Sequence, residues 1–509
     1  MQRRNPPSLQ SLGCGACQLP IKRLCKKVVE LPLNYEYNPA QWKAHLDQVN
    51  KKLQDVQKYI SKLDDNCQQI IGTDVLLYID EVISNFRYKA YTVKDEYLKL
   101  CILLTRSMLF SSIEKINTEA MMTIYTKQAL IISIHRLQNL SCLKLPSERE
   151  FATLRKTVAQ SIKYLPLLTY FENCVNCTDL ILNEIGLHCF LIEHIYVRMS
   201  LGVSFNSISG ILPLVNLKYL DLYDTSMSET GYKIILKMKP RIQNFSWNDA
   251  TENSLSDLDF DRLENIKYCD ISVKNGNVLD LIIESCPKIK HLVLETTVVS
   301  IAPVTNLYLL THLRLHNIDA RKTNISCIFP VLGKNIIILS MQYIMNLNIC
   351  NILLHCVNIH SLELEKCDFS NEQIQDLDDA SLHFKSLKEL TLISNTEIRW
   401  YYESLYNYKN LKEIYIANMR YYSDYYFTLQ LVRNGFSNLE RFVVRQCGDL
   451  EFGTALLIIR NCQHLKEMGC YSEWNGISDG EIHRLFYIIQ NGNFAVTLTN
   501  RFHRKHYFN

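Results

Sequence analysis

The stretch Cys286 to Leu294, "CPKIKHLVL", has the pattern Cys-x-x-Ile-x-x-Leu-x-Leu. The same spacing returns as "CVNIHSLEL" at 356–364, "FKSLKELTL" at 384–392, "YKNLKEIYI" at 408–416 and "CQHLKEMGC" at 462–470. In the second half of each unit, large residues alternate with other residues, which is typical of a short strand with one buried face. The pattern therefore predicts a strand that recurs along the chain.

The second large position of each unit sets the repeat length. Successive positions are separated by about 21 to 28 residues, with a mean of roughly 25, which is the period of leucine-rich repeats. They fall at Leu140, Leu168, Ile192, Leu217, Ile242, Ile266, Ile289, Leu310, Ile336, Ile359, Leu387, Leu411, Leu439 and Leu465. One unit cannot close a core, so neighbouring units must stack and align their strands in a parallel sheet along a concave wall.

The repeats define the predicted fold class, an α/β leucine-rich-repeat solenoid of about 14 repeats. Apolar residues with helical spacing precede Cys286 and Cys462, which predicts helices on the convex side. The predicted domains are a basic arm at 1–36, a helical cap at 37–130, the solenoid at 131–476 and a C-terminal cap at 477–509. Within the last segment, Ser478 and Glu481 form a capping-box pattern.

The helical cap begins with the clearest helix pattern in the chain. Asn38 is suited to an N-cap, and Pro39 to the first helical position. Apolar residues then recur every three or four positions through Leu63, which predicts a helix at 38–64. Further helices are predicted between 73 and 130.

Composition limits the classes of function. The net charge is +3, too small to indicate a dedicated nucleic-acid surface. No stretch has the roughly 20 apolar residues of a membrane span, and the first residues lack the apolar core of a secretory signal. The expected compartment is therefore the cytosol or the nucleus, where the 18 cysteines stay reduced. Four of them occupy the first position of a repeat, where a thiol packs like an apolar group: Cys189, Cys286, Cys356 and Cys462.

No catalytic motif is present. The chain has no G-x-x-x-x-G-K-[ST], no H-E-x-x-H and no G-x-S-x-G sequence. Cys14 and Cys17 form a single C-x-x-C without the second pair that a zinc site needs. We therefore predict a protein that is not an enzyme and uses neither a metal nor a cofactor.

The predicted binding surface is the concave wall, formed by the residues that alternate with the core leucines. It mixes both charges with aromatic rings, which suits a protein ligand. The candidate residues are Tyr219, Asp221, Tyr223, His291, His312, Arg314, His316, Glu363, Glu365, Glu389, Glu413, Tyr415, Arg441 and Arg445. A Tyr-rich segment at 399–427 is a further candidate, and its alternative explanations are packing of helix residues on the convex side or a Tyr-biased composition.

The Cys-x-x-Leu-x-x-Leu-x-Leu core, over about 340 residues, resembles the cysteine-containing leucine-rich repeats of F-box and related ubiquitin-ligase receptors. In that family the repeats hold the substrate and a short N-terminal module docks the ligase core. An F-box itself is not recognisable, since Glu30 to Leu33, "ELPL", matches only a fragment of one. The resemblance implies the substrate-recognition subunit of a cullin-RING ligase, and the alternative is a scaffold or adaptor without a ligase.

A second resemblance concerns Pro20 to Val29, "PIKRLCKKVV". This stretch resembles the elongin-binding box, a helix whose apolar and Cys residues enter a pocket of elongin C. The resemblance implies that Ile21, Leu24, Cys25 and Val29 contact the ligase adaptor. The implied partners are elongin B/C or a Skp-type adaptor, together with a cullin. An ordinary helix that packs on the end of the solenoid would explain the same residues.

Overall fold

The computed structural model describes residues 9–30, 39–86, 94–121, 123–239, 241–248, 260–297, 299–369, 384, 386–396, 410–419, 424–434, 436–446, 450–470, 473–474, 476–492 and 494–499. The chain divides into two compact units. We call Pro6–Ser246 the N-terminal unit and Trp247–Asn509 the C-terminal unit. The helical cap and the first repeats thus belong to one unit, and the predicted limit at residue 131 stays a prediction.

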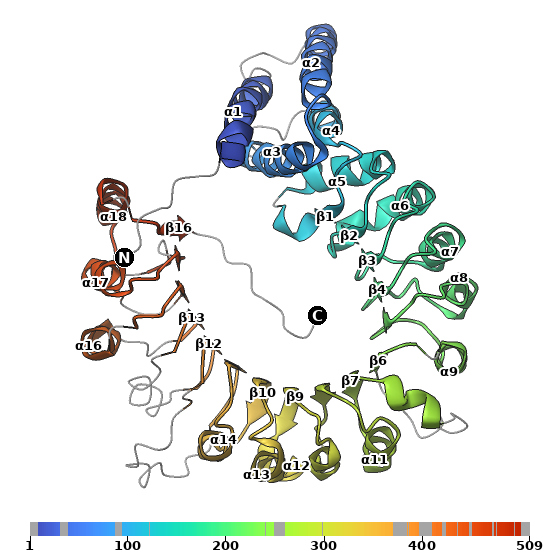
Figure 1. The fold of residues 1–509 in the computed structure, drawn as a ribbon, viewed down its shortest axis with the longest axis vertical. Coiled ribbons are helices and arrows are strands. Elements are labelled where there is room, and N and C mark those ends of the chain that lie inside the picture. The colour runs from blue at the N-terminus through green and yellow to red at the C-terminus, as the bar shows by residue number, and fades with distance from the viewer. Residues whose placement is uncertain are drawn as a thin grey trace. The chain divides into compact units, whose positions relative to one another are not determined.

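The N-terminal unit begins with helices and continues as repeats (Figure 1). Its helices are α1 (Leu9–Glu30), α2 (Pro39–Ile60), α3 (Asp65–Phe86), α4 (Lys94–Met108), α5 (Ile124–Ser133), α6 (Arg155–Ile162), α7 (Asp179–His188), α8 (Ile208–Ile211) and α9 (Glu229–Met238). Its strands are β1 (Lys115–Asn117), β2 (Cys142–Lys144), β3 (Tyr170–Glu172), β4 (His194–Tyr196), β5 (Tyr219–Asp221) and β6 (Asn244–Trp247), which ends one residue beyond the unit. Its 3₁₀ segments are η3 (Thr118–Ala120), η4 (Ile134–Arg136), η5 (Arg149–Leu154) and η6 (Phe205–Ser207).

The C-terminal unit consists of repeats. Its strands are β7 (Tyr268–Ser272), β8 (His291–Glu295), β9 (His312–Asp319), β10 (Ile338–Met345), β11 (Ser361–Glu365), β12 (Glu389–Ile393), β13 (Glu413–Ala417), β14 (Arg441–Arg445), β15 (Glu467–Gly469) and β16 (Thr497–Thr499). Its helices are α11 (Gly276–Ser285), α12 (Ala320–Thr323), α13 (Ile328–Leu332), α14 (Ile349–His355), α16 (Asp424–Asn434), α17 (Phe452–Asn461) and α18 (Asp479–Asn491), with 3₁₀ segments η7 (Phe260–Asn265), η8 (Ala302–Asn306) and η9 (Ile325–Cys327).

The strands form two parallel sheets in chain order, one of 5 strands from β1 to β5 and one of 11 strands from β6 to β16. In each unit the strands lie on the inner side of the curve and the repeat helices on the outer side (Figure 1). All fourteen repeat-setting residues are buried, with exposed fractions of 3% or less. The predicted leucine-rich-repeat solenoid is therefore confirmed, as are its four buried cysteines at position one of the repeat.

The predicted ends of the array are also present as elements. Helix α2 covers most of the predicted helix at 38–64. In α18, Ser478 and Glu481 form the reciprocal capping box that the sequence indicates. The structure adds one strand to the segment predicted as a helical cap, because β1 at Lys115–Asn117 pairs with β2 in parallel and the sheet begins before residue 131. This strand has three residues with only Ile116 buried, too short to produce an alternation.

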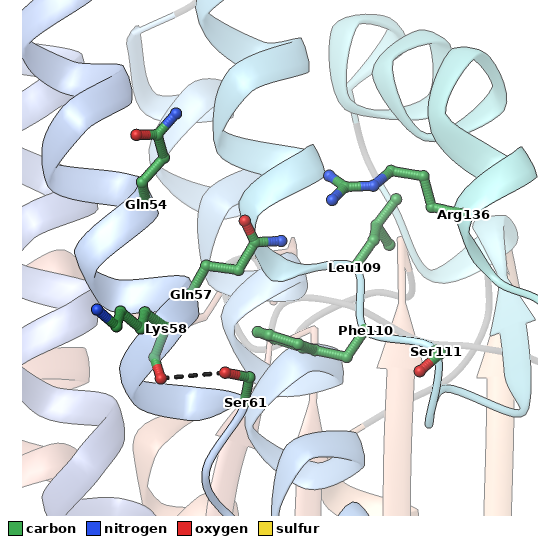
Figure 2. Close-up of a pocket in the computed structure, with 8 residues that line it drawn as sticks. All are labelled: Gln54, Gln57, Lys58, Ser61, Leu109, Phe110, Ser111 and Arg136. Carbon is green, nitrogen blue, oxygen red and sulfur yellow. Dashed lines mark hydrogen bonds between the residues drawn. The ribbon is translucent and has the colours of Figure 1, made fainter.

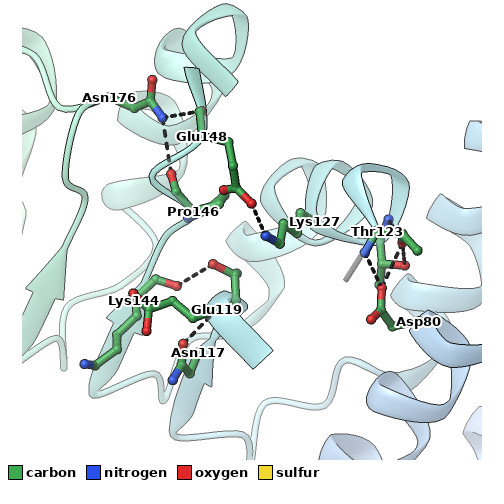
Figure 3. Close-up of polar contacts among 11 residues, drawn as sticks. Asp80, Asn117, Glu119, Thr123, Lys127, Lys144, Pro146, Glu148 and Asn176 are labelled. Carbon is green, nitrogen blue, oxygen red and sulfur yellow. Dashed lines mark hydrogen bonds and ion pairs between the residues drawn. The ribbon is translucent and has the colours of Figure 1, made fainter. Parts of the chain in front are cut away.

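The helical part and the first repeats are joined by polar contacts, of which those of Asp80 are buried (Figure 3). The Asp80 carboxylate on α3 accepts hydrogen bonds from the backbone N–H of Thr123 at 3.0 Å and from its hydroxyl at 2.8 Å. Thr123 is in turn the N-cap of α5. Further along, Lys127 pairs with Glu148, and the Asn176 amide donates to the carbonyl of Glu148 at 2.9 Å. These contacts fix the first repeat against the helices.

One side chain ends the sheet of β1 to β5. Asn244 is buried, its Oδ1 accepts from the backbone N–H of Leu220 at 2.8 Å, and its Nδ2 donates to the carbonyl of Leu220 at 2.8 Å. The amide thus makes the hydrogen bonds that a neighbouring backbone would make, since it carries a donor and an acceptor in one plane. The sheet therefore ends without unpaired groups at Leu220.

A residue with left-handed backbone follows the strand in many repeats. Examples are Val175, Met199, Asp224, Lys366, Ser394, Asn418, Gln446 and Cys470, with φ between 46° and 70°. Asn and Asp tolerate this region, whereas a β-branched residue is strained there. Val175, with φ of 70°, is therefore the least suitable residue type in this series.

We expect Val175→Asn to stabilise the N-terminal unit by about 1 kcal/mol, because it removes the steric cost of a β-branched residue in the left-handed region. The thermal unfolding midpoint of the purified chain measures the effect. Val215→Asn is the matched control, because Val215 is exposed and lacks positive φ. An equal gain in both variants would show that the backbone at Val175 is not strained.

Candidate protein-binding face

The strand face is the surface formed by the strand side chains that point away from the repeat core. Neighbouring strands pair in register, so equivalent residues form rows across the sheet. The first row of the C-terminal unit includes His291, His312, Ile338, Ser361, Glu389, Glu413, Arg441 and Glu467. The candidate wall residues on β5, β8, β9, β11, β12, β13 and β14 all occupy such positions, and Tyr223 lies just after β5.

In the N-terminal unit the strand face carries a stack of rings that we call the aromatic ladder: Tyr170, His194, Tyr196 and Tyr219. The rings of His194 and Tyr219 are 4.6 Å apart and nearly parallel at 7°. Tyr170 lies 5.8 Å from His194 and 5.3 Å from Tyr196. The register of β3, β4 and β5 thus gives a rigid aromatic surface before any partner arrives.

Charged groups beside the ladder are paired. The Lys144 ammonium lies 2.9 Å from Glu172, which also accepts a hydrogen bond from the Tyr170 hydroxyl at 2.6 Å. Arg198 lies 2.7 Å from the Asp221 carboxylate. Burial raises the pKa of Asp221, and Arg198 opposes that shift. Asp221 is 5% exposed, so it positions Arg198 rather than presenting its own carboxylate on the expected wall.

In the C-terminal unit two histidines stack on the strand face. The rings of His291 and His312 are 3.9 Å apart at 10°. The Thr311 hydroxyl lies 2.8 Å from Nδ1 of His312. Burial lowers the pKa of His312 to about 4, with a further contribution from His291, and burial also lowers the pKa of His291. Both imidazoles are therefore neutral at pH 7 and stack without repulsion.

This pair predicts a pH dependence of stability. A histidine with a folded pKa of about 4 favours the folded state fully above its ordinary pKa of 6.5, and the benefit is lost as the pH falls from 6.5 towards 4, because the unfolded chain takes up the proton first. We expect His312→Phe, which keeps a ring but cannot titrate, to flatten the fall of the unfolding midpoint over this range. His483→Phe, at an exposed position on α18, is the control and should leave the slope unchanged. An unaltered slope in His312→Phe would contradict the assignment.

The next strands carry a polar group centred on Gln342. Its amide donates to Glu363 at 2.9 Å and to Glu365 at 3.2 Å. Arg314 donates to the Ser340 hydroxyl at 3.3 Å, and its guanidinium lies 3.9 Å from Glu363. Glu363 is buried, so, like Asp221, it supports its neighbours instead of standing out on the wall.

Ion pairs continue across β13 to β15. The Arg441 guanidinium contacts Glu413 at 3.1 Å and Glu467 at 2.8 Å, one on each neighbouring strand. Arg445 lies 3.1 Å from Glu473. Nearer the start of the same sheet, His316 on β9 lies 3.6 Å from Glu295 on β8. Such networks hold long side chains in one geometry, which lowers the entropy lost when a partner binds.

Several strand-face residues were not among the sequence candidates. They are Tyr170, Glu172, His194, Tyr196, Gln342 and Glu467, together with Arg198 and Glu473, which follow β4 and β15 and pair with residues of the face. The first four lie on β3 and β4, where the alternation with buried Phe171 and Ile195 is visible in the sequence. Their detection required only the same alternation rule applied to those two repeats.

The residues of the elongin-type box lie on α1, which packs on α3. Ile21 is 5% exposed and Cys25 is fully buried, while Leu24 is half-buried. Burial raises the pKa of the Cys25 thiol to about 12. The side chain of Val29 lies outside the described residues. Two of the four residues that would contact the adaptor, Ile21 and Cys25, are thus already packed inside the N-terminal unit.

The structure also bears on the Tyr-rich segment, on metal binding and on membrane spans. Residues 399–409 and 420–423 of the Tyr-rich segment lie outside the described residues, whereas Phe427 is buried and stacks on Phe442 with ring centres 4.8 Å apart. Within the described part of the chain, no group of three or more His, Cys, Asp or Glu side chains could hold a metal. No helix among the described residues is long and apolar enough to cross a membrane.

No protein-family model matches the chain, and no curated protein matches it. Solved structures with a similar chain trace include an internalin from Listeria monocytogenes, at 14% identity and a TM-score of 0.33, covering 73% of this chain and 83% of that one. A leucine-rich-repeat protein of Leptospira interrogans is 13% identical with a TM-score of 0.31, covering 78% and 91%. A chain of the Rad7 and Elc1 complex in yeast is 15% identical with a TM-score of 0.41, and the match covers 72% of this chain and 91% of that one.

The parallel sheets and the buried repeat positions define the class of protein. The chain is a leucine-rich-repeat solenoid with a parallel sheet on its inner side.

Proposed function

We propose that the strand face binds a partner protein and that the chain serves as the substrate-recognition subunit of a cullin-RING ubiquitin ligase. The observation that carries the binding part is the aromatic ladder with its neighbouring ion pairs, Lys144 with Glu172 and Arg198 with Asp221. Tyr and Arg dominate binding hot spots because they bury a large area and keep a polar tip. Rings that are already stacked lose little freedom when a partner covers them.

The strand-face proposal is tested by affinity purification of the full chain and of Tyr variants. Tyr196→Ala and Tyr219→Ala shorten the ladder, whereas Tyr308→Ala and Tyr487→Ala remove exposed tyrosines on a turn and on α18. We expect the ladder variants to lose partners that both control variants keep. Retention of every partner by Tyr196→Ala and Tyr219→Ala would reject the ladder as the binding site.

The ligase part of the proposal rests on the resemblance of the repeats and of α1 to ligase receptors. It requires that the full chain co-purify with elongin B/C or with a Skp-type adaptor, and with a cullin. Because Ile21 and Cys25 pack on α3, adaptor insertion of these side chains also requires α1 to separate from α3. Leu24→Asp at the half-buried position should then abolish adaptor binding, whereas Leu19→Asp at an exposed position of α1 should not.

The burial of Ile21 and Cys25 favours a second candidate, a scaffold or adaptor without a ligase. In that case α1 is a permanent part of the helical cap, and its apolar face closes the core of the N-terminal unit. Binding to neither elongin B/C nor a Skp-type adaptor would reject the ligase proposal and leave the scaffold. The Tyr variants test the strand face independently of this outcome.

A further inference from the structure

A cleft lies in the helical part of the N-terminal unit, away from the strand face. It has a volume of about 550 Å³. One wall is the last two turns of α2 with Gln54, Gln57 and Lys58, and the other is the segment after α4 together with Arg136 at the end of η4 (Figure 2). Leu109 and Phe110, both largely buried, belong to the segment after α4 and supply the apolar part of that wall. The strand-face proposal does not involve this cleft.

The polar side chains that line the cleft are two cations, two amides and the hydroxyls of Ser61 and Ser111. None of the described residues that line it is acidic. In the described part of the chain, neither Arg136 nor Lys58 pairs with a carboxylate, although ion pairs elsewhere in the unit satisfy Lys127, Lys144 and Arg198. In Figure 2 the Arg136 guanidinium and the Gln57 amide point towards each other across the opening. Two donors thus converge on a space that a bound group could fill.

Three helical segments end at this cleft, α2 at Ile60, α4 at Met108 and η4 at Arg136. Helix C-termini carry partial negative charge, which alone would favour a cation. Two carbonyls near these ends are already satisfied, because Arg136 Nη1 donates to the Arg106 carbonyl at 2.8 Å and the Ser61 hydroxyl to the Lys58 carbonyl at 3.0 Å. A guanidinium has five N–H donors, so most of those on Arg136 stay available for a carboxylate.

We propose that this cleft binds an acidic peptide segment of a partner protein, with a carboxylate held between Arg136 and Gln57 and the neighbouring side chain placed over Phe110. The charges support this occupant. The Arg136 guanidinium carries a full positive charge, whereas the helix ends carry only partial charges and the carbonyls of Arg106 and Lys58 are already satisfied. An arginine recognises a carboxylate with two parallel hydrogen bonds, which gives the contact a fixed direction. The chain would then hold a partner at a second point besides the strand face.

The test uses the full chain and a fluorescein-labelled dodecapeptide of alternating Glu and Leu, with fluorescence anisotropy as the readout. Matching peptides carry Gln or Lys in place of Glu. We expect saturable binding of the Glu peptide, and binding of the Gln and Lys peptides at least tenfold weaker. Failure of the Glu peptide to saturate, or equal binding of the Lys peptide, would overturn the proposal.

Variants locate the binding. Arg136→Glu removes the proposed anchor, and Gln57→Glu adds a carboxylate to the cleft without removing any hydrogen bond seen for that side chain. Each variant should lower the affinity for the Glu peptide at least tenfold. Arg241→Glu has the same change of charge as Arg136→Glu at an exposed turn after α9, and should change the affinity less than twofold. Full binding to Gln57→Glu, or an equal loss in Arg241→Glu, would place the peptide elsewhere and reject this cleft.

Discussion

Gly186→Ala is expected to destabilise the N-terminal unit by about 3 kcal/mol or more, an effect in the range of severe overpacking. A Cβ atom at Gly186 on α7 would lie 2.1 Å from the carbonyl oxygen and 2.6 Å from the Cα of Gly210 on α8. Both are backbone atoms, so no side-chain rotation relieves the overlap and the two helices must move apart. Thermal unfolding of the purified chain and hydrogen exchange of residues 170–221 measure the loss.

The control for this substitution is Gly453→Ala on α17. Nothing lies within 4 Å of a Cβ built at Gly453, so the change removes only backbone freedom and should stabilise that helix by up to about 1 kcal/mol. The same residue change thus has opposite signs at two helical glycines. Equal behaviour of the two variants would show that α7 and α8 are not in such close contact.

The contact between α7 and α8 also affects the strand face. These helices lie in the repeats that contain β4 and β5, whose register places the rings of His194 and Tyr219 4.6 Å apart. Separation of the helices should disturb that register. Gly186→Ala should therefore also weaken the binding of any partner that depends on the aromatic ladder. The glycines on the outer side thus help to position the binding side chains on the inner side.

The repeat architecture was predictable because it depends on one rule applied many times. Each repeat-setting residue, such as Leu217 or Leu411, must be apolar if the units share a core, and the spacing alone locates it. The alternation rule also placed His312 and Arg441 on the strand face, although it did not reveal their partners. A strand position determines which side a residue faces, and therefore a set of wall candidates follows directly.

What the sequence could not provide was the pairing between repeats. The contact of Arg441 with Glu413 and Glu467 depends on register between strands roughly 26 residues apart, and repeat lengths here vary by several residues. For the same reason the sequence placed Asp221 on the wall but did not show that Arg198 from the preceding repeat pairs with its buried carboxylate. The amide of Asn244, which ends the first sheet, has no sequence signature because Asn is also common on surfaces.

The elongin-type box illustrates a different difficulty. Ile21 and Cys25 on one side of a helix fit both a partner's pocket and an internal core, since both environments select small apolar side chains. Only the position of α3 distinguishes the two, and that position depends on the packing of the whole helical part. The burial of Cys25 therefore leads to a prediction that separates the two interpretations of α1.

Cys25→Asp is expected to destabilise the helical part of the N-terminal unit by about 3 kcal/mol or more, because it buries a carboxylate without a partner. Protection of α1 and α3 against hydrogen exchange should fall, since α1 packs on α3. In the unmodified protein the Cys25 thiol should resist alkylation at pH 8, because burial raises its pKa to about 12 and the thiolate is the reactive form.

Lys27→Asp is the control, two residues away on an exposed position of the same helix, and should cost less than about 1 kcal/mol. If α1 were instead held free for an adaptor, Cys25→Asp would leave stability and hydrogen exchange unchanged, and Cys25 would be alkylated as fast as a thiol in a peptide. In that case the variant would abolish adaptor binding alone. The pair of variants thus distinguishes a helix that completes the core from one that awaits a ligase, whichever adaptor that ligase uses.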